Sequence, residues 1–424
     1  TDVYYKHESS DEFEPLVTGE DAIFHPRIHR DKVYLRTSHE APNYRVIVYD
    51  LDERGDSEEV IPEDTNGILK TIETVGDRII AQYERDAVSE MDIYTLDGER
   101  ITHVDLPEHG TVTGLNGREE SDEFFFQFES FNQPPTVYRY DIPDNELEVI
   151  NQQDVEIKSD IVVKQEWYES KDGTEVPMFI IHKKGIELDG DNPTLVHGYG
   201  GFEISITPSF DKYRLPFVED GGVFAQPNLR GGGEFGEEWH HAAMHDKKQN
   251  TFDDMISAVE YLIQKGYTRK DRVGIMGGSN GGLTVGAVVT QRSDLVKACF
   301  CSVPLLDMLR FHKFLLGESW TTEYGSPENE EDYEYIKEYS PYHNVNERNY
   351  PAVMFKTAES DTRVHPAHAR KMTALMQERN TSDNPIILRT ETSTGHGVGK
   401  PISKIVEEEL DQWCFLYDQL GVNR

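Results

Sequence analysis

The chain has 424 residues, with 42 Lys or Arg against 79 Asp or Glu and a formal net charge of −37. This length exceeds the roughly 250–300 residues at which a single hydrophobic core stops growing, so two domains are expected. A polyanion would be repelled by so negative a surface, which excludes nucleic acid as a partner. The hydrophobic fraction of 37% is too high for a disordered chain.

Compartment signals in the sequence indicate a cytoplasmic protein. No stretch approaches the roughly 18 consecutive apolar residues of a membrane span, and the first residues do not resemble a signal peptide. Cys299, Cys301 and Cys414 are too few and too oddly spaced for a disulfide framework or a zinc site. The acidic excess is spread along the chain, which suits a halophilic cytoplasm where molar salt screens the self-repulsion. An ordinary acidic protein from a low-salt cell is the alternative.

Short β-type runs dominate the chain before residue 160. They form three pairs, at residues 33–35 and 44–50, 78–83 and 91–97, and 123–128 and 136–141. The aspartates that close these pairs, at positions 50, 97 and 141, are 47 and 44 residues apart. A spacing of about 45 residues is typical of a β-propeller blade. We therefore predict a partial β-propeller of three to four blades over residues 1–157, with a β-sandwich of coincidental spacing as the alternative.

Strands and helices alternate after residue 160. Predicted strands cover residues 193–196, 222–225, 272–276, 352–355 and 386–388, and predicted helices cover residues 252–263, a segment from Gly281, and residues 405–420. Thr251 is expected to cap the first helix, and Gly266 to end it. This alternation predicts a doubly wound, mostly parallel sheet covered on both faces, an α/β-hydrolase type of domain, over residues 158–424.

A G-x-S-x-G motif lies in the run Gly277–Gly282, between a predicted strand and a predicted helix. A nucleophilic serine needs such a sharp turn, and the glycines beside Ser279 permit close backbone approach. The N-terminus of the following helix offers free N–H groups to an oxyanion. A glycine turn that serves only packing or phosphate binding is the alternative.

Two candidate partners of Ser279 follow it in the order Asp then His, the chain order of α/β-hydrolases. Asp361 lies six residues after the predicted strand that ends at Phe355, and His396 stands between two glycines after the strand around Ile387. Both positions are loops at C-terminal strand ends, where open parallel sheets place active sites. His396 can accept the serine proton while Asp361 holds its other ring nitrogen. A surface histidine is the alternative for His396.

Six motifs carry a specific resemblance: Tyr199-Gly200-Gly201-Phe202, Asn228-Leu229-Arg230-Gly231-Gly232-Gly233-Glu234, the Gly277–Gly282 turn, Trp320-Thr321-Thr322-Glu323-Tyr324-Gly325, Asp361-Thr362-Arg363-Val364 and Gly395-His396-Gly397-Val398-Gly399-Lys400-Pro401. Together they make the chain resemble the prolyl oligopeptidase family of serine peptidases. These motifs cover nearly all of residues 160–424. The first half also resembles the later part of the propeller of that family.

The resemblance implies a role for each matching residue. Ser279 is the expected nucleophile, Asp361 the orienting acid and His396 the general base. The oxyanion would be bound by the Tyr199 hydroxyl and the backbone N–H of Asn280. The pocket for a proline ring would be formed by Trp320, Phe202, Tyr324 and Val364, and Arg363 would hold a substrate carbonyl. Flat aromatic walls suit the pyrrolidine ring, although core packing is the alternative for these aromatic residues.

The resemblance also implies a serine endopeptidase that cleaves short proline-containing peptides after proline through an acyl-enzyme, without a metal or organic cofactor. Family members carry a further N-terminal segment and a seven-bladed propeller, so this chain is expected to be a piece of a longer protein or the product of a truncated gene. Two alternatives stay open: an oligopeptidase that cleaves after basic residues, and an inactive remnant that binds peptides or a partner. The sequence makes no prediction about oligomeric state.

The charge excess predicts that salt stabilises the protein. Counterions relieve repulsion among the 37 excess negative charges, so the melting temperature should rise between low and molar potassium chloride. Screening alone saturates at a few tenths molar, so a further rise into molar salt would indicate ion binding or stronger hydrophobic burial. A melting temperature that is unchanged or lower in molar salt, measured by calorimetry, would contradict the halophilic interpretation.

Overall fold

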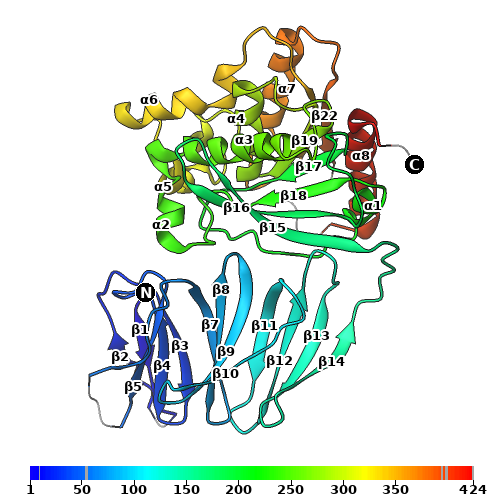
Figure 1. Ribbon diagram of the computed structural model, residues 1–424. Coiled ribbons are helices and arrows are strands. Elements are labelled where there is room, and N and C mark those ends of the chain that lie inside the picture. Colours follow the sequence, from blue (N-terminus) through cyan, green and yellow to red (C-terminus); the bar gives the residue numbers. More distant parts are fainter. Residues whose placement is uncertain (9, 53–55, 393–394, 397–399, 423–424) are drawn as a thin grey trace. The chain divides into compact units, whose positions relative to one another are not determined.

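The computed structural model describes residues 1–8, 10–52, 56–392, 395–396 and 400–422. The chain forms two compact units (Figure 1). The first consists of Thr1–Val155 with the short segments Thr207–Phe210 and Glu234–Glu237. The second consists of Glu156–Ile206, Asp211–Gly233 and Glu238–Arg424.

The first unit contains three four-stranded antiparallel sheets and one two-stranded sheet. The strands of the two-stranded sheet are β1 (Val3–Tyr5) and β2 (Glu14–Val17). The four-stranded sheets comprise β3 (Phe24–His29), β4 (Lys32–Thr37), β5 (Arg45–Asp50) and β6 (Glu58–Ile61); β7 (Ile68–Val75), β8 (Arg78–Arg85), β9 (Val88–Thr95) and β10 (Arg100–His103); and β11 (Thr111–Gly117), β12 (Glu123–Glu129), β13 (Thr136–Asp141) and β14 (Glu146–Gln152). Within each of them, strands adjacent in sequence are adjacent in space.

The repeated pairs predicted from the sequence are the two central strands of these sheets. Asp50 and Asp141 end the third strands β5 and β13, and Asp97 follows the third strand β9. In β12 the side chains of Phe124, Phe126 and Phe128 are buried and alternate with more exposed residues. This period of two is what a sheet with one face packed in the core requires. The predicted spacing therefore reflects a repeated four-stranded unit.

The second unit is built on an eight-stranded sheet of order β15-β16-β18-β17-β19-β20-β21-β22. Its strands are β15 (Ile161–Glu169), β16 (Glu175–Lys183), β17 (Thr194–His197), β18 (Val223–Pro227), β19 (Val273–Gly278), β20 (Ala298–Ser302), β21 (Ala352–Ala358) and β22 (Ile386–Glu391). Strands β17 to β22 are parallel to one another, and β15 and β16 add an antiparallel edge next to β18. All seven residues of β21 are buried, as expected where helices cover both faces.

Two groups of helices cover this sheet (Figure 1). On one face lie α1 (Leu215–Glu219) and α8 (Ile402–Leu420), which contact each other through Phe217 and Trp413 with ring centroids 5.6 Å apart. On the other lie α3 (Gln249–Gln264), α4 (Asn280–Gln291) and α7 (Ala367–Arg379). Shorter helices α2 (Gly236–His241), α5 (Thr321–Tyr324) and α6 (Glu330–Tyr339) lie in the connections. The predicted doubly wound sheet is thus confirmed.

The predicted capping role of Thr251 is wrong. Helix α3 begins at Gln249, so Thr251 lies inside its first turn and is fully buried. Its Oγ1 is 2.9 Å from the carbonyl oxygen of Arg230 and 3.2 Å from that of Gly200. The hydroxyl therefore donates to loop carbonyls instead of accepting from a free helix N–H.

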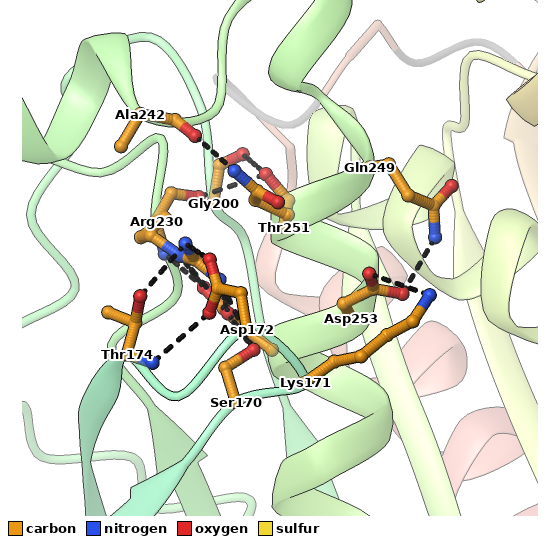
Figure 2. A network of polar contacts seen from close by, with 12 residues as sticks. Ser170, Lys171, Asp172, Thr174, Gly200, Arg230, Ala242, Gln249, Thr251 and Asp253 are labelled. Atoms are coloured by element: carbon orange, nitrogen blue, oxygen red, sulfur yellow. Dashed lines mark hydrogen bonds and ion pairs between the residues drawn. The ribbon is translucent and has the colours of Figure 1, made fainter.

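A buried guanidinium joins three segments of the second unit (Figure 2). Arg230 lies in the loop after β18, and its Nη2 is 2.6 Å from Oδ1 of Asp254 in α3. Its Nη1 is 2.6 Å from Oδ2 of Asp172 in the β15–β16 turn. The backbone N–H of Arg230 also donates to Asp254 at 2.9 Å. Because Arg230 and Asp254 are both buried, each leaves the other uncompensated if it is removed.

We expect Arg230→Met to lower the free energy of unfolding by about 3 kcal/mol, because it leaves the Asp254 carboxylate buried without its cation. Unfolding in urea, followed by circular dichroism, measures this change. Arg292→Met is the matched control, since Arg292 pairs with Glu260 and Asp294 at the surface and such pairs contribute about 0–1 kcal/mol. Equal losses in the two variants would contradict the importance of the Arg230 network.

Candidate active site

Four of the predicted site residues follow parallel strands at the same edge of the sheet. Tyr199 follows β17, Ser279 follows β19, Asp361 follows β21 and His396 follows β22. The chain leaves β17 for β18 on one side, whereas β19 lies on the other side of β17. Loops after β17 and β19 therefore diverge, and open parallel sheets bind their ligands in the crevice at such a point.

Ser279 occupies a strained turn between β19 and α4. Its φ is +57° and its ψ is −117°, a conformation that residues with a side chain seldom adopt. A Cβ atom on Gly277 would lie 2.4 Å from the carbonyl oxygen of Gly281, and one on Gly281 would lie 2.5 Å from that of Gly198. Only glycine fits at these two positions, so the G-x-S-x-G pattern is required by the tight turn that presents the serine.

Asp361 and His396 form the hydrogen-bonded pair expected of an orienting acid and a base. Oδ2 of Asp361 lies 2.6 Å from Nδ1 of His396, and Oδ1 accepts the backbone N–H groups of Arg363 and Val364 at 2.8 and 2.9 Å. Burial alone would raise the pKa of Asp361, but these hydrogen bonds outweigh it and hold that pKa below its usual value. The buried side chain therefore stays a carboxylate and fixes the imidazole.

Gly397, Val398 and Gly399 of the glycine-rich motif around His396 lie outside the described residues. Gly395 and His396 are described, and the His396 ring is about one-fifth exposed, which leaves it accessible to a reactant.

Tyr199 lies close enough to Ser279 for the serine side chain to affect the pKa of its phenol. Burial raises the pKa of Tyr199, the negative charge of Glu323 raises it further, and Ser279 and Arg363 oppose the shift. The phenol therefore remains protonated and able to donate. Since Asn280 is the first residue of α4, its backbone N–H has no partner one turn back in the helix.

The predicted pocket residues Phe202, Trp320, Tyr324 and Val364 share one hydrophobic cluster. The rings of Phe202 and Tyr324 meet edge to face with centroids 5.6 Å apart. Tyr324 and Val364 are buried within the cluster, whereas Phe202 and Trp320 keep partly exposed surface. Arg363, which precedes Val364 in the sequence, is exposed. A ligand ring at this cluster would therefore contact Trp320 and Phe202 first.

A buried ionic cluster beside these residues was not predicted. Nζ of Lys248 lies 3.1 Å from Oε1 of Glu323, and Nε2 of His240 lies 2.8 Å from Oε2. Glu323 is a single carboxylate in the aromatic run from Trp320 to Tyr324, which is a local hint of a buried anion. Its cation lies 75 residues away in the sequence, and no local pattern identifies it.

Neither a metal centre nor a membrane-spanning helix is found in the described part of the chain. Among those residues, no group of three or more His, Cys, Asp or Glu side chains is arranged to hold a metal ion. Nor does any helix within the described ranges combine the length and apolarity needed to cross a membrane.

Comparisons with known proteins agree with this geometry. Residues 208–423 match the "Prolyl oligopeptidase family", and residues 1–153 match the "Prolyl oligopeptidase, N-terminal beta-propeller domain". The prolyl endopeptidase of Elizabethkingia meningoseptica is 37% identical over 416 residues, which cover 97% of this chain and 59% of the relative. A partial propeller and an α/β-hydrolase domain, the predicted fold class, are thus confirmed.

Solved structures give the same result. One prolyl endopeptidase structure is 41% identical with a TM-score of 0.93. The match covers 100% of this chain and 63% of the endopeptidase chain. Prolyl oligopeptidase B from Galerina marginata, bound to a 35mer hydrolysis and macrocyclization substrate, is 33% identical with a TM-score of 0.91. That match covers 98% of this chain and 60% of the oligopeptidase chain. The chain thus spans about three-fifths of the length of these relatives. On these matches and on its strained serine turn, the chain belongs to the prolyl oligopeptidase family.

Proposed function

We propose that this chain carries the catalytic machinery of a serine endopeptidase that cleaves short peptides on the C-terminal side of proline. The observation that carries the proposal is the 2.8 Å hydrogen bond from the Tyr324 hydroxyl to Oδ1 of Asn280. It joins the aromatic cluster to the residue that follows Ser279. A proline ring at the cluster would thus place the carbonyl carbon of that proline near the nucleophile. In this proposal residues 158–424 are the catalytic domain and residues 1–157 the partial propeller.

The proposed reaction begins with attack of Ser279 Oγ on the carbonyl carbon of the proline residue at P1. His396 removes the hydroxyl proton and then delivers it to the leaving amine, while Asp361 holds the ring and stabilises the imidazolium. The acyl-enzyme is hydrolysed by a water that His396 activates in the same way. The hydrogen bond between Asp361 and Nδ1 of His396 leaves Nε2 of the same ring available for proton transfer. This geometry supports the proposed roles of Asp361 and His396.

The proposed oxyanion site consists of the Tyr199 hydroxyl and the backbone N–H of Asn280. A donor aimed at developing charge in a dry site is worth about 3 kcal/mol of transition-state stabilisation. The raised pKa of Tyr199, caused first by burial and then by Glu323, supports a donor that keeps its proton. Arg363 would bind a further substrate carbonyl.

Proline specificity is favoured over basic specificity by the charges at the pocket. A lysine or arginine at P1 would need a free carboxylate to replace its lost water. The carboxylate within the Trp320–Tyr324 run is Glu323, which already pairs with Lys248 and His240. The partly exposed faces of Trp320 and Phe202 instead offer dispersion contacts to a flat apolar ring.

We also propose that the protein works in the cytoplasm of a cell with high internal salt. The support is the charge of −37 together with acidic side chains such as Glu119, Glu120, Glu330 and Glu331, all of which are exposed. Exposed like charges are screened by salt, so they are tolerated where salt is abundant.

Ser279 is expected to be the only serine that a fluorophosphonate labels, because the proposal gives this serine alone a general base and oxyanion donors. Labelling is located by mass spectrometry of digested protein and should disappear in Ser279→Ala. Ser302 is a suitable control position, since its backbone oxygen accepts the Ser279 N–H and it lies close to the turn. Labelling that persists in Ser279→Ala, or that is lost in Ser302→Ala alone, would disprove the assignment.

Peptides that differ only at P1 test the specificity. Cleavage should be fastest after proline, much slower after alanine and negligible after lysine or arginine. Trp320→Ala should lower kcat/KM for proline peptides roughly thirtyfold, which corresponds to about 2 kcal/mol of transition-state stabilisation. The loss for alanine peptides should be smaller, because the proline ring makes more contact with the indole than the alanine methyl group does.

Trp167→Ala is the matched control, since Trp167 is a partly exposed residue of β15 outside the proposed pocket, and its effect on kcat/KM should be under about twofold. Preference for arginine would support the basic-specificity alternative. Equal losses for proline and alanine peptides in Trp320→Ala would show that Trp320 is only a packing residue.

A further inference from the structure

A buried ion pair lies against the loop that contains Tyr199 and Phe202. Lys248 is 0% exposed and Glu323 is 2% exposed, with Nζ and Oε1 3.1 Å apart. Nζ of Lys248 also donates to the carbonyl oxygen of Gly200 at 2.8 Å. Nε2 of His240 lies 2.8 Å from Oε2 of Glu323, and the backbone N–H of Phe202 helps to lower the pKa of Glu323. The pair thus acts on both residues that flank Gly201.

The same pair borders the aromatic cluster. Glu323 is adjacent in α5 to Tyr324, and Nζ of Lys248 lies 5.6 Å from the centroid of the Tyr324 ring. Tyr324 in turn donates to Asn280, the residue after Ser279. One lysine therefore contacts the segment of the proposed oxyanion donor and the segment of the proposed pocket. Burial lowers the pKa of Lys248, and the charge and hydrogen bond of Glu323 oppose that shift and favour the ammonium form.

The negative charge of Glu323 influences the ionisation of Tyr199. Burial would raise the pKa of Glu323, but the hydrogen bond from His240 and the charge of Lys248 outweigh it and hold that pKa below its usual value, so Glu323 is an anion. Its charge contributes, after burial, to the raised pKa of Tyr199. An anion that disfavours a phenolate at this position also disfavours an oxyanion bound to the phenol, unless a cation cancels it.

We propose that Lys248 is a positioning residue with an electrostatic role: it cancels the field of Glu323 at the oxyanion site and fixes Gly200 so that Tyr199 faces Ser279. The inference rests on the proposed function only in taking Tyr199 as an oxyanion donor. It does not depend on proline specificity.

Stability alone is a weak reason for this pair. Two charges taken from water are costly, and well-packed apolar residues in their place are often as stable or more so. A purely structural clamp would be insensitive to which partner is removed. A charge-cancelling role predicts opposite results for removal of the cation and of the anion, because the oxyanion is negative.

The test compares Lys248→Met, Glu323→Gln and the double variant in the full chain. The first readout is the rate of Ser279 labelling by a fluorophosphonate, whose phosphonyl oxygen occupies the oxyanion site, and the second is the split of kcat and KM on a proline peptide. Lys248→Met should lose at least about tenfold in labelling rate and kcat, with KM changed by less than about threefold. Glu323→Gln should label at least as fast as the wild type, and the double variant should recover most of the loss.

Lys247→Met is the matched control, since Lys247 is the exposed neighbour of Lys248 and loses the same charge, and its labelling rate should not change. Three results would overturn the inference: a wild-type labelling rate in Lys248→Met, a loss in Glu323→Gln as large as in Lys248→Met, or a double variant no faster than Lys248→Met. If Lys248→Met does not fold, Glu323→Gln and the double variant still decide between the two roles. Labelling of Ser279 without cleavage of any proline peptide would contradict the proposed function alone.

Discussion

The side-chain amide of Asn280 is the contact on which the arrangement of the site depends. Its Nδ2 donates to the carbonyl oxygen of Tyr199 at 2.7 Å, and its Oδ1 accepts the Tyr324 hydroxyl at 2.8 Å. Asn280 is fully buried, so an unsatisfied amide there would cost about 1–3 kcal/mol. Because Ser279 precedes it, the loop after β17, the serine turn and the aromatic cluster share one fixed point. Displacement of the loop or of the cluster relative to the serine turn therefore breaks a hydrogen bond to Asn280.

Two polar side chains donate hydrogen bonds to the carbonyl oxygen of Gly200, which follows Tyr199. Nζ of Lys248 and Oγ1 of Thr251 lie 2.8 and 3.2 Å from it. Thr251 also reaches the carbonyl of Arg230, whose guanidinium is anchored by the buried carboxylate of Asp254 (Figure 2). A loop that would otherwise have free carbonyls is therefore held by donors from α3 and its start. Pre-organisation of this kind lets a donor stabilise developing charge without first reorienting.

The sequence could indicate the candidate triad but not the contacts that support it. Ser279, Asp361 and His396 are marked locally, by glycines and by buried strands that end just before them, and parallel strands bring such ends to one edge. Lys248 and Glu323 are 75 residues apart, and their pairing follows from the way α5 packs beside the start of α3. Thr251 was misassigned for the same reason, because a hydroxyl near a helix start has two possible uses, and tertiary contacts decide between them.

Charges in this protein fall into two physical classes. Exposed carboxylates such as Glu330 and Glu331 interact through water, and salt weakens these interactions within a Debye length of about 8 Å or less. Buried pairs such as Arg230 with Asp254 and Lys248 with Glu323 are out of reach of counterions, so salt changes them little. The acidic surface can therefore adapt to the ionic medium while the electrostatics around Ser279 stay constant. The response of the surface to salt and the electrostatics around Ser279 are then separable, because they depend on different sets of charges.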